Sequence, residues 1–222
     1  ETQGTIAVGK FDQAQMKQLK KLNEELLFVD FDGLALGINS LVVDFSQGVQ
    51  LIIDQFIKEK HERIGILSGM EYTKGSRHEI DDPRFLVFRE YLTRLKLYNE
   101  ADHLQGAFTI EGGYTARKTY LESHTDYPTA FFASSDALAI GAMRAIQGHG
   151  LRIPEDISVI GFNDVSVAKY VTPALTTVKV YTEWMGELAV STILELIQEK
   201  APVPRKITVG TELILRESTR DS

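Results

Sequence analysis

The sequence contains no cysteine among its 222 residues. This absence excludes disulfide bonds, thiolate metal sites and cysteine nucleophiles, and it is compatible with a reducing compartment. No apolar run approaches the roughly 20 residues that a membrane-spanning helix needs, and the opening residues ETQGTIAVGK do not resemble a signal peptide. With 43% hydrophobic residues, the sequence predicts a soluble, globular protein with a substantial core.

The chain also has no excess of positive charge. The chain carries 24 basic and 31 acidic side chains, for a formal net charge of −7, which supplies no general attraction to phosphate backbones. The five histidines are scattered, and no pair has the i, i+4 spacing of a helical metal site. We therefore expect no metal and no cofactor, and we expect that these residues alone do not bind DNA tightly.

Familiar catalytic patterns are absent as well. The sequence has no GxGxxG, GxxxxGK[ST], HExxH or GxSxG segment, so it shows neither a common nucleotide-binding loop nor a common hydrolase signature. We expect a protein that is not an enzyme and has no catalytic residues.

The most informative segment that is present covers residues 129–164. The apolar run 130–133 precedes a helix with apolar residues at helical spacing, and a second apolar run covers 157–160. Short strands that are apolar on both faces are typical of a parallel sheet. Ligands of such sheets lie beyond the carboxyl ends of the strands. The polar residues at these ends are Ser135, Asp136, Asn163 and Asp164.

The rest of the chain continues this alternation and predicts an α/β fold. Further strands are expected at 5–8, 25–31, 40–45, 64–67, 106–108, 175–181 and 207–215, and helices at 13–22, from about 48 to 56, and at 83–95, 112–123 and 183–199. The polar residues between Met70 and Asp82 are expected to form a long loop, and such loops are often functional lids.

Two side chains, Arg84 and Phe108, occupy positions that the local sequence pattern makes notable. Arg84 lies in the first turn of a helix that Asp82 and Pro83 begin, where a positive charge opposes the helix dipole. It indicates either a bound partner or an ion pair with Asp81 or Asp82. Phe108 follows a strand, where an aromatic residue usually belongs to the core.

Several segments together resemble one protein family. RIPEDISVIGFND, PALTTVKV and SSDALAIGAMRA resemble the effector-binding core of the LacI/GalR family of bacterial transcription repressors, which is similar to the periplasmic sugar-binding proteins. SLVVDFSQGV, KHERIGILSG, DDPRFLVF and FTIEGGYTA resemble further family motifs in the same order. The likeness covers essentially the whole chain.

The resemblance implies a set of effector-binding positions. Arg84 matches the family's sugar-binding arginine, whose planar fork can hold two neighbouring hydroxyls, and Phe108 matches an aromatic residue that packs on the effector ring. The remaining implied contacts are Ser135, Asn163, Tyr181 and Met185. Asn163 replaces an aspartate of many relatives, so the identity of the effector does not carry over. Three aspartates are structural or possible site positions, with Asp136 expected as a helix cap: Asp44, Asp136 and Asp164.

The resemblance also implies an architecture of two Rossmann-like subdomains with parallel sheets, like type I periplasmic binding proteins. We expect one at 1–60 plus 180–205 and the other at 61–179 plus 206–222. Nothing in the chain resembles the family's helix-turn-helix DNA-binding segment, and the first subdomain is expected to lack its opening strand–helix–strand stretch.

The function implied by the resemblance is that of a cytoplasmic, homodimeric, sugar-responsive repressor. Its effector, for which a galactoside is one candidate, would bind between the subdomains and alter operator DNA affinity by allostery through the DNA-binding segment. A periplasmic sugar-binding component of a transporter is the alternative, because it would share the fold and the pocket chemistry. An enzyme is a distant third.

Overall fold

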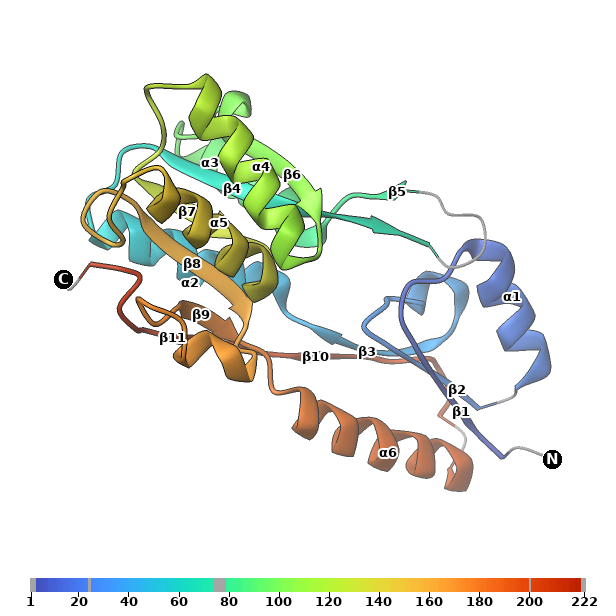
Figure 1. Ribbon diagram of the computed structural model, residues 1–222. Helices are drawn as coiled ribbons and strands as arrows, with labels where there is room; N and C mark the ends of the chain where they lie inside the picture. The colour runs from blue at the N-terminus through green and yellow to red at the C-terminus, as the bar shows by residue number, and fades with distance from the viewer. Residues whose placement is uncertain (1–2, 24, 74–78, 200, 221–222) are drawn as a thin grey trace. The chain divides into compact units, whose positions relative to one another are not determined.

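The computed structural model describes residues 3–23, 25–73, 79–199 and 201–220. The chain forms two compact units, each assembled from separate segments (Figure 1). Unit 1 comprises Glu1–Asp44, Tyr72–Ile80 and Tyr181–Gly210, and unit 2 comprises Phe45–Glu71, Asp81–Val180 and Thr211–Ser222. Mixed α/β units with parallel sheets confirm the expected fold class.

Unit 1 contains a four-stranded parallel sheet with the order β1-β2-β3-β10. Its elements are β1 (Thr5–Val8), α1 (Gln13–Leu22), β2 (Leu26–Val29), the short 3₁₀ helix η1 (Leu34–Leu36), β3 (Asn39–Val43), α6 (Thr182–Gln198) and β10 (Lys206–Val209). α1 begins at a reciprocal capping box between Asp12 and Gln15. Its residue Met16 packs with Ala7 and Phe28 of the sheet.

The second sheet has the order β11-β9-β8-β7-β4-β5, with β6 paired to β4. Its strands are β4 (Ile64–Tyr72), β5 (Glu79–Ile80), β6 (His103–Ala107), β7 (Ala130–Ala133), β8 (Ser158–Asn163), β9 (Thr176–Lys179) and β11 (Glu212–Ile214). The helices that alternate with these strands along the chain are α2 (Phe45–Lys58), α3 (Pro83–Arg94), η2 (Glu100–Asp102), α4 (Ile110–Ser123), α5 (Asp136–Gly148) and η3 (Ser166–Lys169). The ladders of β4, β6, β7, β8 and β9 are parallel, whereas β11 pairs with β9 in the antiparallel direction.

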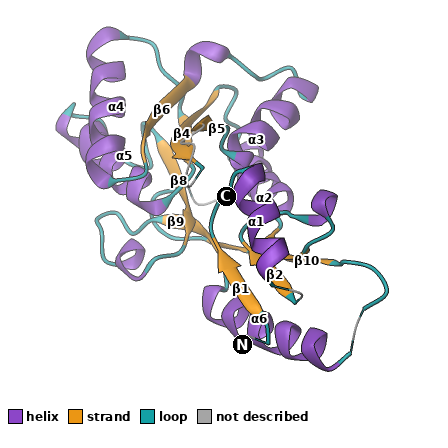
Figure 2. Ribbon diagram, turned by 90° about the vertical axis from the view of Figure 1, so that its right-hand side faces the viewer, coloured by secondary structure: helices purple, strands orange, loops and turns teal. Residues whose placement is uncertain are grey.

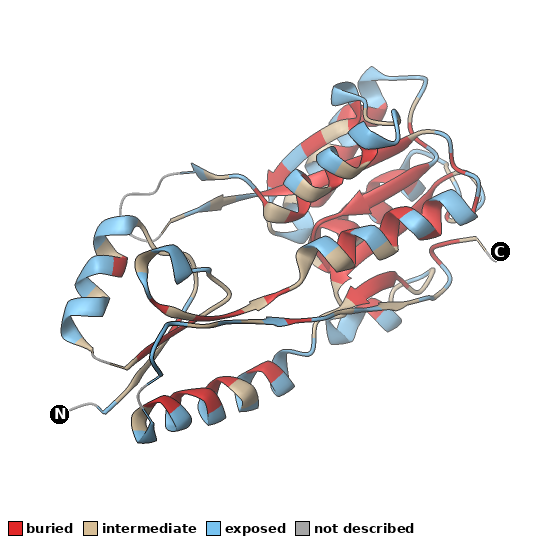
Figure 3. Cartoon of the chain, turned by 180° about the vertical axis from the view of Figure 1, so that it is seen from behind, coloured by how far each residue is buried: buried red, intermediate tan, exposed pale blue. Residues whose placement is uncertain are grey.

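Helices cover both faces of this sheet. Successive strand residues point to opposite sides, and the apolar side chains on each side pack against helices. In β7, Phe131 packs with residues of α4 and α5, whereas its neighbour Phe132 packs with residues of α2 and α3. Figure 2 shows α4 and α5 side by side, and Figure 3 shows the strands of this sheet largely buried. The arrangement leaves the carboxyl ends of the strands free to carry polar groups.

Three sequence predictions differ from the structure. The strand expected at 207–215 is two strands, because β10 pairs with β3 in unit 1 and β11 pairs with β9 in unit 2. The helix expected from Gly48 begins at Phe45 and belongs to unit 2, where Val49 and Phe56 join the core beside α3. Part of the loop expected between 70 and 82 is the end of β4 and all of β5. The rest of that predicted lid, residues 74–78, lies outside the described residues.

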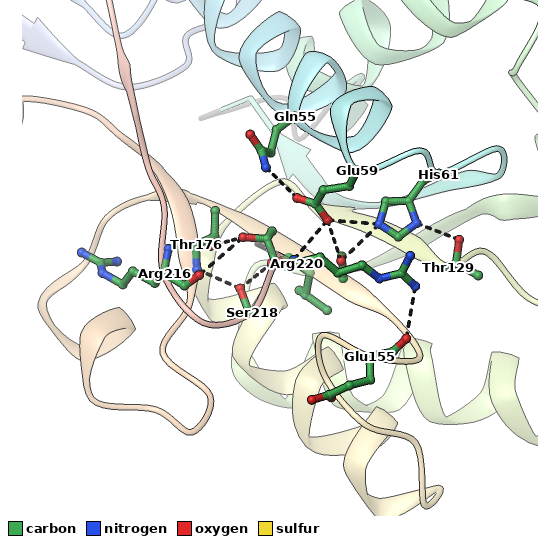
Figure 4. A network of polar contacts seen from close by, with 12 residues as sticks. Gln55, Glu59, His61, Thr129, Glu155, Thr176, Arg216, Ser218 and Arg220 are labelled. Carbon is green, nitrogen blue, oxygen red and sulfur yellow. Dashed lines mark hydrogen bonds and ion pairs between the residues drawn. The ribbon is translucent and has the colours of Figure 1, made fainter. Parts of the chain in front are cut away.

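A buried polar network secures the C-terminal segment of unit 2 (Figure 4). The Glu59 carboxylate accepts hydrogen bonds from Gln55 Nε2 (2.8 Å), Ser158 Oγ (2.9 Å) and the Arg220 backbone amide (3.2 Å). Ser218 also binds Val159 of β8: the Ser218 carbonyl accepts from the Val159 amide at 2.8 Å, and the Ser218 hydroxyl donates to the Val159 carbonyl at 2.6 Å. The last described residues are therefore an integral part of the core.

Candidate functional site

Arg84 is the second residue of α3, and Asp82 fixes both its backbone and its side chain. The Asp82 carboxylate caps the helix by accepting from the Arg84 amide (3.0 Å), and it also accepts from Arg84 Nε (2.7 Å). The structure contains the ion pair with Asp82, one of the two alternatives that the sequence left open, and this pair compensates for the unfavourable position of the charge at the helix start. Among the described residues, the two terminal nitrogens of Arg84 have no hydrogen-bond partner.

Three aromatic rings surround this guanidinium. Its central carbon lies 5.0 Å from the ring centre of Phe45, 5.3 Å from that of Phe108 and 5.6 Å from that of Phe162. These distances allow cation–π attraction, which strengthens when water is excluded. Only 9% of the Arg84 side chain is exposed. The result is a positively charged fork held in apolar surroundings with its outer donors available.

The end of β4 supports this arrangement. A side chain at Gly69 would collide with the Phe108 ring, so this close approach requires glycine. The Gly69 amide donates to Ser134 Oγ at 3.0 Å and to the Asp82 carboxylate at 3.4 Å. The ends of β4 and β7 and the start of α3 therefore position Arg84 and Phe108 together.

At the end of β7, the helix cap is Ser135 and not Asp136. Ser135 is the cap of α5, because its hydroxyl oxygen accepts from the Leu138 amide at 3.2 Å. Asp136 is the first helical residue, and its carboxylate accepts instead from the Val165 amide (2.7 Å) and from Thr177 Oγ1 (2.5 Å). The prediction that Asp136 caps the helix was wrong, although its role is structural. Either residue could cap in the sequence, and only the tertiary contacts distinguish them.

Asn163 and Asp164 follow at the end of β8 with φ angles of 109° and 58°. Asp164 pairs with Arg216 at 2.7 Å. The Asn163 side-chain amide has no hydrogen-bond partner within the described part of the chain. These residues lie at the carboxyl end of the same sheet as Gly69 and Ser134.

The other candidates belong to unit 1. Asp44 follows β3, and its amide donates to the Val209 carbonyl at 2.8 Å. Tyr181 precedes α6 and is 38% exposed, whereas Met185, one turn later, is buried. The structure thus brings Arg84 and Phe108 into contact, and it adds two rings that the sequence analysis did not select. Phe45 directly follows Asp44, and Phe162 directly precedes Asn163, so each was adjacent to a selected residue.

The arrangement that most resembles a catalytic one contains a buried serine. Ser68 Oγ lies 2.8 Å from His103 Nε2, and His103 Nδ1 lies 3.9 Å from Glu100 Oε1. Ser68 is only 1% exposed. Across the described ranges there is no group of three acidic or histidine side chains suited to a metal ion, and no helix is long and apolar enough to cross a membrane.

Comparison with known proteins gives the family. The sequence profile of the periplasmic binding protein-like domain matches residues 53–219. The chain belongs to this family. Within it, the chain is 37% identical over 220 residues to the HTH-type transcriptional regulator GalR of Streptococcus thermophilus and 34% identical over 218 residues to GalR of Lacticaseibacillus casei. These alignments cover 99% and 98% of this chain and 66% of each relative.

A solved structure supports the same assignment to the LacI/GalR group. The lac repressor dimer bound to operator and the anti-inducer ONPF superposes with a TM-score of 0.86 at 27% identity, covering 98% of this chain and 74% of that one. The resemblance to this group of the periplasmic binding protein-like family is therefore confirmed over the effector-binding core. The chain spans about two thirds of the length of the GalR relatives, 66% in each case.

Proposed function

We propose that this chain is the effector-binding core of a sugar-responsive transcriptional repressor. Relatives that cover nearly the whole chain are regulators, which favours this function over the transporter alternative. A galactoside is the first effector to test, because the GalR relatives are the most similar of those described above. The proposal includes a homodimer in the cytoplasm, supported by the similarity to a repressor dimer on operator DNA.

The observation that carries the proposal is the state of the Arg84 guanidinium. Asp82 occupies Nε, while the outer nitrogens point to no hydrogen-bond acceptor among the described residues. A planar pair of donors in apolar surroundings matches two adjacent hydroxyls of a sugar ring. The Phe108 ring at 5.3 Å supplies an apolar surface for the face of that ring.

The neighbouring strand ends add polar groups to the proposed site. The Ser135 oxygen accepts a bond from Leu138, but its hydroxyl hydrogen can still donate to an effector. The Asn163 amide can donate and accept at once. Tyr181, Met185 and Asp44 belong to unit 1 and stay predicted positions that rest on the family resemblance alone.

Calorimetry with D-galactose, lactose, melibiose and cellobiose tests the proposal. At least one of these sugars should bind the wild-type chain, and Arg84→Ala should abolish its binding. Loss of a charge-assisted bidentate contact costs roughly 2 to 4 kcal/mol. Arg84→Lys keeps the charge but not the fork, so it should bind at least tenfold more weakly.

Arg89→Lys is the matched control, because Arg89 lies on the same helix over the Phe85 ring and away from the proposed site. It should bind as the wild type does. Unchanged affinity in both Arg84 variants, with the fold confirmed by circular dichroism, would remove Arg84 from the site. Failure of the wild type to bind any sugar of the panel would overturn the proposed effector class.

A further inference from the structure

The turn after β8 holds two consecutive residues in an unfavourable backbone conformation. Asn163 has φ 109° and Asp164 has φ 58°, and neither is glycine. The left-handed region costs L-residues roughly 1 to 2 kcal/mol each, although asparagine and aspartate tolerate it better than most residues. Such strain persists only where the surroundings hold it in place.

Two carboxylates tie down the strained turn. The Asp136 carboxylate accepts from the amide of Val165, the residue immediately after the pair, at 2.7 Å. Asp136 is itself 0% exposed, and Thr177 Oγ1 fixes its other oxygen at 2.5 Å. The close packing extends to Gly161 of β8, where a side chain would collide with the Asp136 carboxylate.

The second tie is made by the pair itself, because the Asp164 carboxylate pairs with Arg216 Nη2 at 2.7 Å. Arg216 is fixed in turn, because its Nη1 donates to the Leu175 carbonyl (2.8 Å) and its amide donates to Thr176 Oγ1 (2.8 Å). The turn is therefore held by one group from α5 and one from the C-terminal segment. Neither group is adjacent to it in sequence.

These contacts with Asp136 and Arg216 do not involve the Asn163 side chain, which can still form hydrogen bonds with a ligand. The Asn163 carbonyl is used by the Val180 amide at 3.4 Å, so the backbone on both sides of its side chain is constrained. We infer that Asp136 and the Asp164–Arg216 ion pair are positioning residues that hold the strained turn and thereby present the Asn163 amide to the effector. The part of this inference that concerns the effector rests on the proposed function. The part that concerns how the turn is held does not.

Amide hydrogen exchange and calorimetry on the same variants separate these two parts. Asp136→Ala removes both acceptors, so the Val165 amide should exchange at least tenfold faster and the affinity for the sugar bound by the wild type should fall at least tenfold. Asp136→Asn retains one acceptor and should recover most of both losses. Arg216→Met keeps an apolar stem but frees Asp164, and it should lower affinity in the same direction.

Arg152→Met is the matched control, because Arg152 forms an exposed ion pair with Asp156 outside the turn. It should change neither the Val165 exchange nor the sugar affinity. The inference is overturned if Asp136→Ala and Arg216→Met both fold and either leave Val165 exchange unchanged or bind the sugar as the wild type does. If the wild type binds no sugar of the panel, the proposed function fails by itself, and the exchange rates alone then decide whether these residues hold the turn.

Discussion

Glu59 Oε2 lies 3.1 Å from His61 Nε2, and both side chains are almost completely buried. His61 also contacts Thr129 Oγ1 at 2.9 Å through its other ring nitrogen. His61 therefore lies in the interior and not in the candidate site. The pair joins the end of α2 to the start of β8 and to the C-terminal segment, as Figure 4 shows.

Glu59→Gln should destabilise unit 2. An amide cannot accept all four of the hydrogen bonds that the carboxylate accepts, so buried donors lose partners at a cost of about 1 to 3 kcal/mol. Chemical denaturation should show a lower midpoint. The control is Glu62→Gln, at an exposed glutamate three residues away, which should leave the midpoint unchanged. An equal effect of both substitutions would contradict the assigned role of the network.

The same glutamate predicts a loss of stability in acid. Burial would raise the pKa of Glu59, but hydrogen bonds from His61, Gln55 and Ser158 outweigh it and hold that pKa below its ordinary value of 4.5. A lowered pKa in the folded state gives stability that is present above about pH 4.5 and is lost as the pH falls through the folded pKa. The free energy of unfolding should therefore fall below pH 4.5 in the wild type and fall less steeply in Glu59→Gln.

Asp136→Asn should raise the stability of the protein at neutral pH, whereas Glu59→Gln should lower it. Burial, with a smaller contribution from Asp164, raises the pKa of Asp136 from 3.8 to about 6. The folded state then binds the proton more tightly than the unfolded state, so stability falls as the pH rises from about 4 to 6. At pH 7 the buried charge costs on the order of 2 to 3 kcal/mol.

Removing that charge should raise the free energy of unfolding at pH 7, and the gain should shrink towards pH 4. Asp156→Asn is the control, because hydrogen bonds from Arg152 hold the pKa of Asp156 at about 2 and ionisation there is favourable. Denaturation series at pH 4, 5, 6 and 7 provide the measurement. A pH-independent difference between Asp136→Asn and the wild type would show that the carboxylate does not titrate in this range.

Arg117 should be replaceable without loss of stability. The side chain is fully buried, and Nε, Nη1 and Nη2 have no hydrogen-bond partner among the residues that the structure describes. Burial lowers the pKa of Arg117 to about 10. Its guanidinium lies 4.1 Å from the ring centre of Phe131, but cation–π attraction of about 2 kcal/mol is smaller than the several kcal/mol that desolvating a charge costs.

Arg117→Met should therefore raise the melting temperature or leave it unchanged, with a gain of up to about 3 kcal/mol. Lys118→Met provides the control, because Lys118 is the next residue of α4 and is exposed. Differential scanning calorimetry of the two variants is sufficient. A large destabilisation by Arg117→Met alone would mean that the folded state gives Arg117 a partner.

Replacing glycines with alanine should lower stability where two helices pack closely and raise it where only helix propensity matters. A side chain at Gly113 of α4 would collide with the Leu138 carbonyl, and one at Gly141 of α5 would collide with the Ile110 carbonyl. Gly113→Ala and Gly141→Ala should each cost about 1 to 3 kcal/mol through overpacking. At Gly186 of α6, no described residue outside the helix's own backbone and the chain neighbours lies within 4 Å of the added carbon. Gly186→Ala should therefore stabilise the protein by roughly 0.5 to 1 kcal/mol.

Local sequence patterns predicted most elements of the fold but not their assignment to units. The helix Gln13–Leu22 and the strands around Ala130 and Ile160 follow from spacing and composition within one segment. The split of the last strand depends on whether β3 or β9 is the partner, and no local pattern contains that information. For the same reason the position of α2 in unit 2 could not be read from its own residues.

The candidate site shows the same limit. Arg84 was conspicuous because its charge opposes the helix dipole, and its partner Asp82 was close in sequence. Phe45 and Phe162 reach Arg84 from distant segments, so only the folded chain reveals them. The bond from Val165 to Asp136 likewise spans 29 positions of sequence, which is why the sequence suggested a helix cap.

The pairing of β10 with β3 and of β11 with β9 has a consequence for biosynthesis. A ribosome adds residues from the N-terminus onwards, and domains of many proteins fold as each one emerges. Here residues 206–209 supply a strand to one sheet, and residues 212–214 supply a strand to the other. The strands β3 and β9 therefore lack these partners until residues 206–214 have been synthesised, so neither described sheet can be completed before that point of translation.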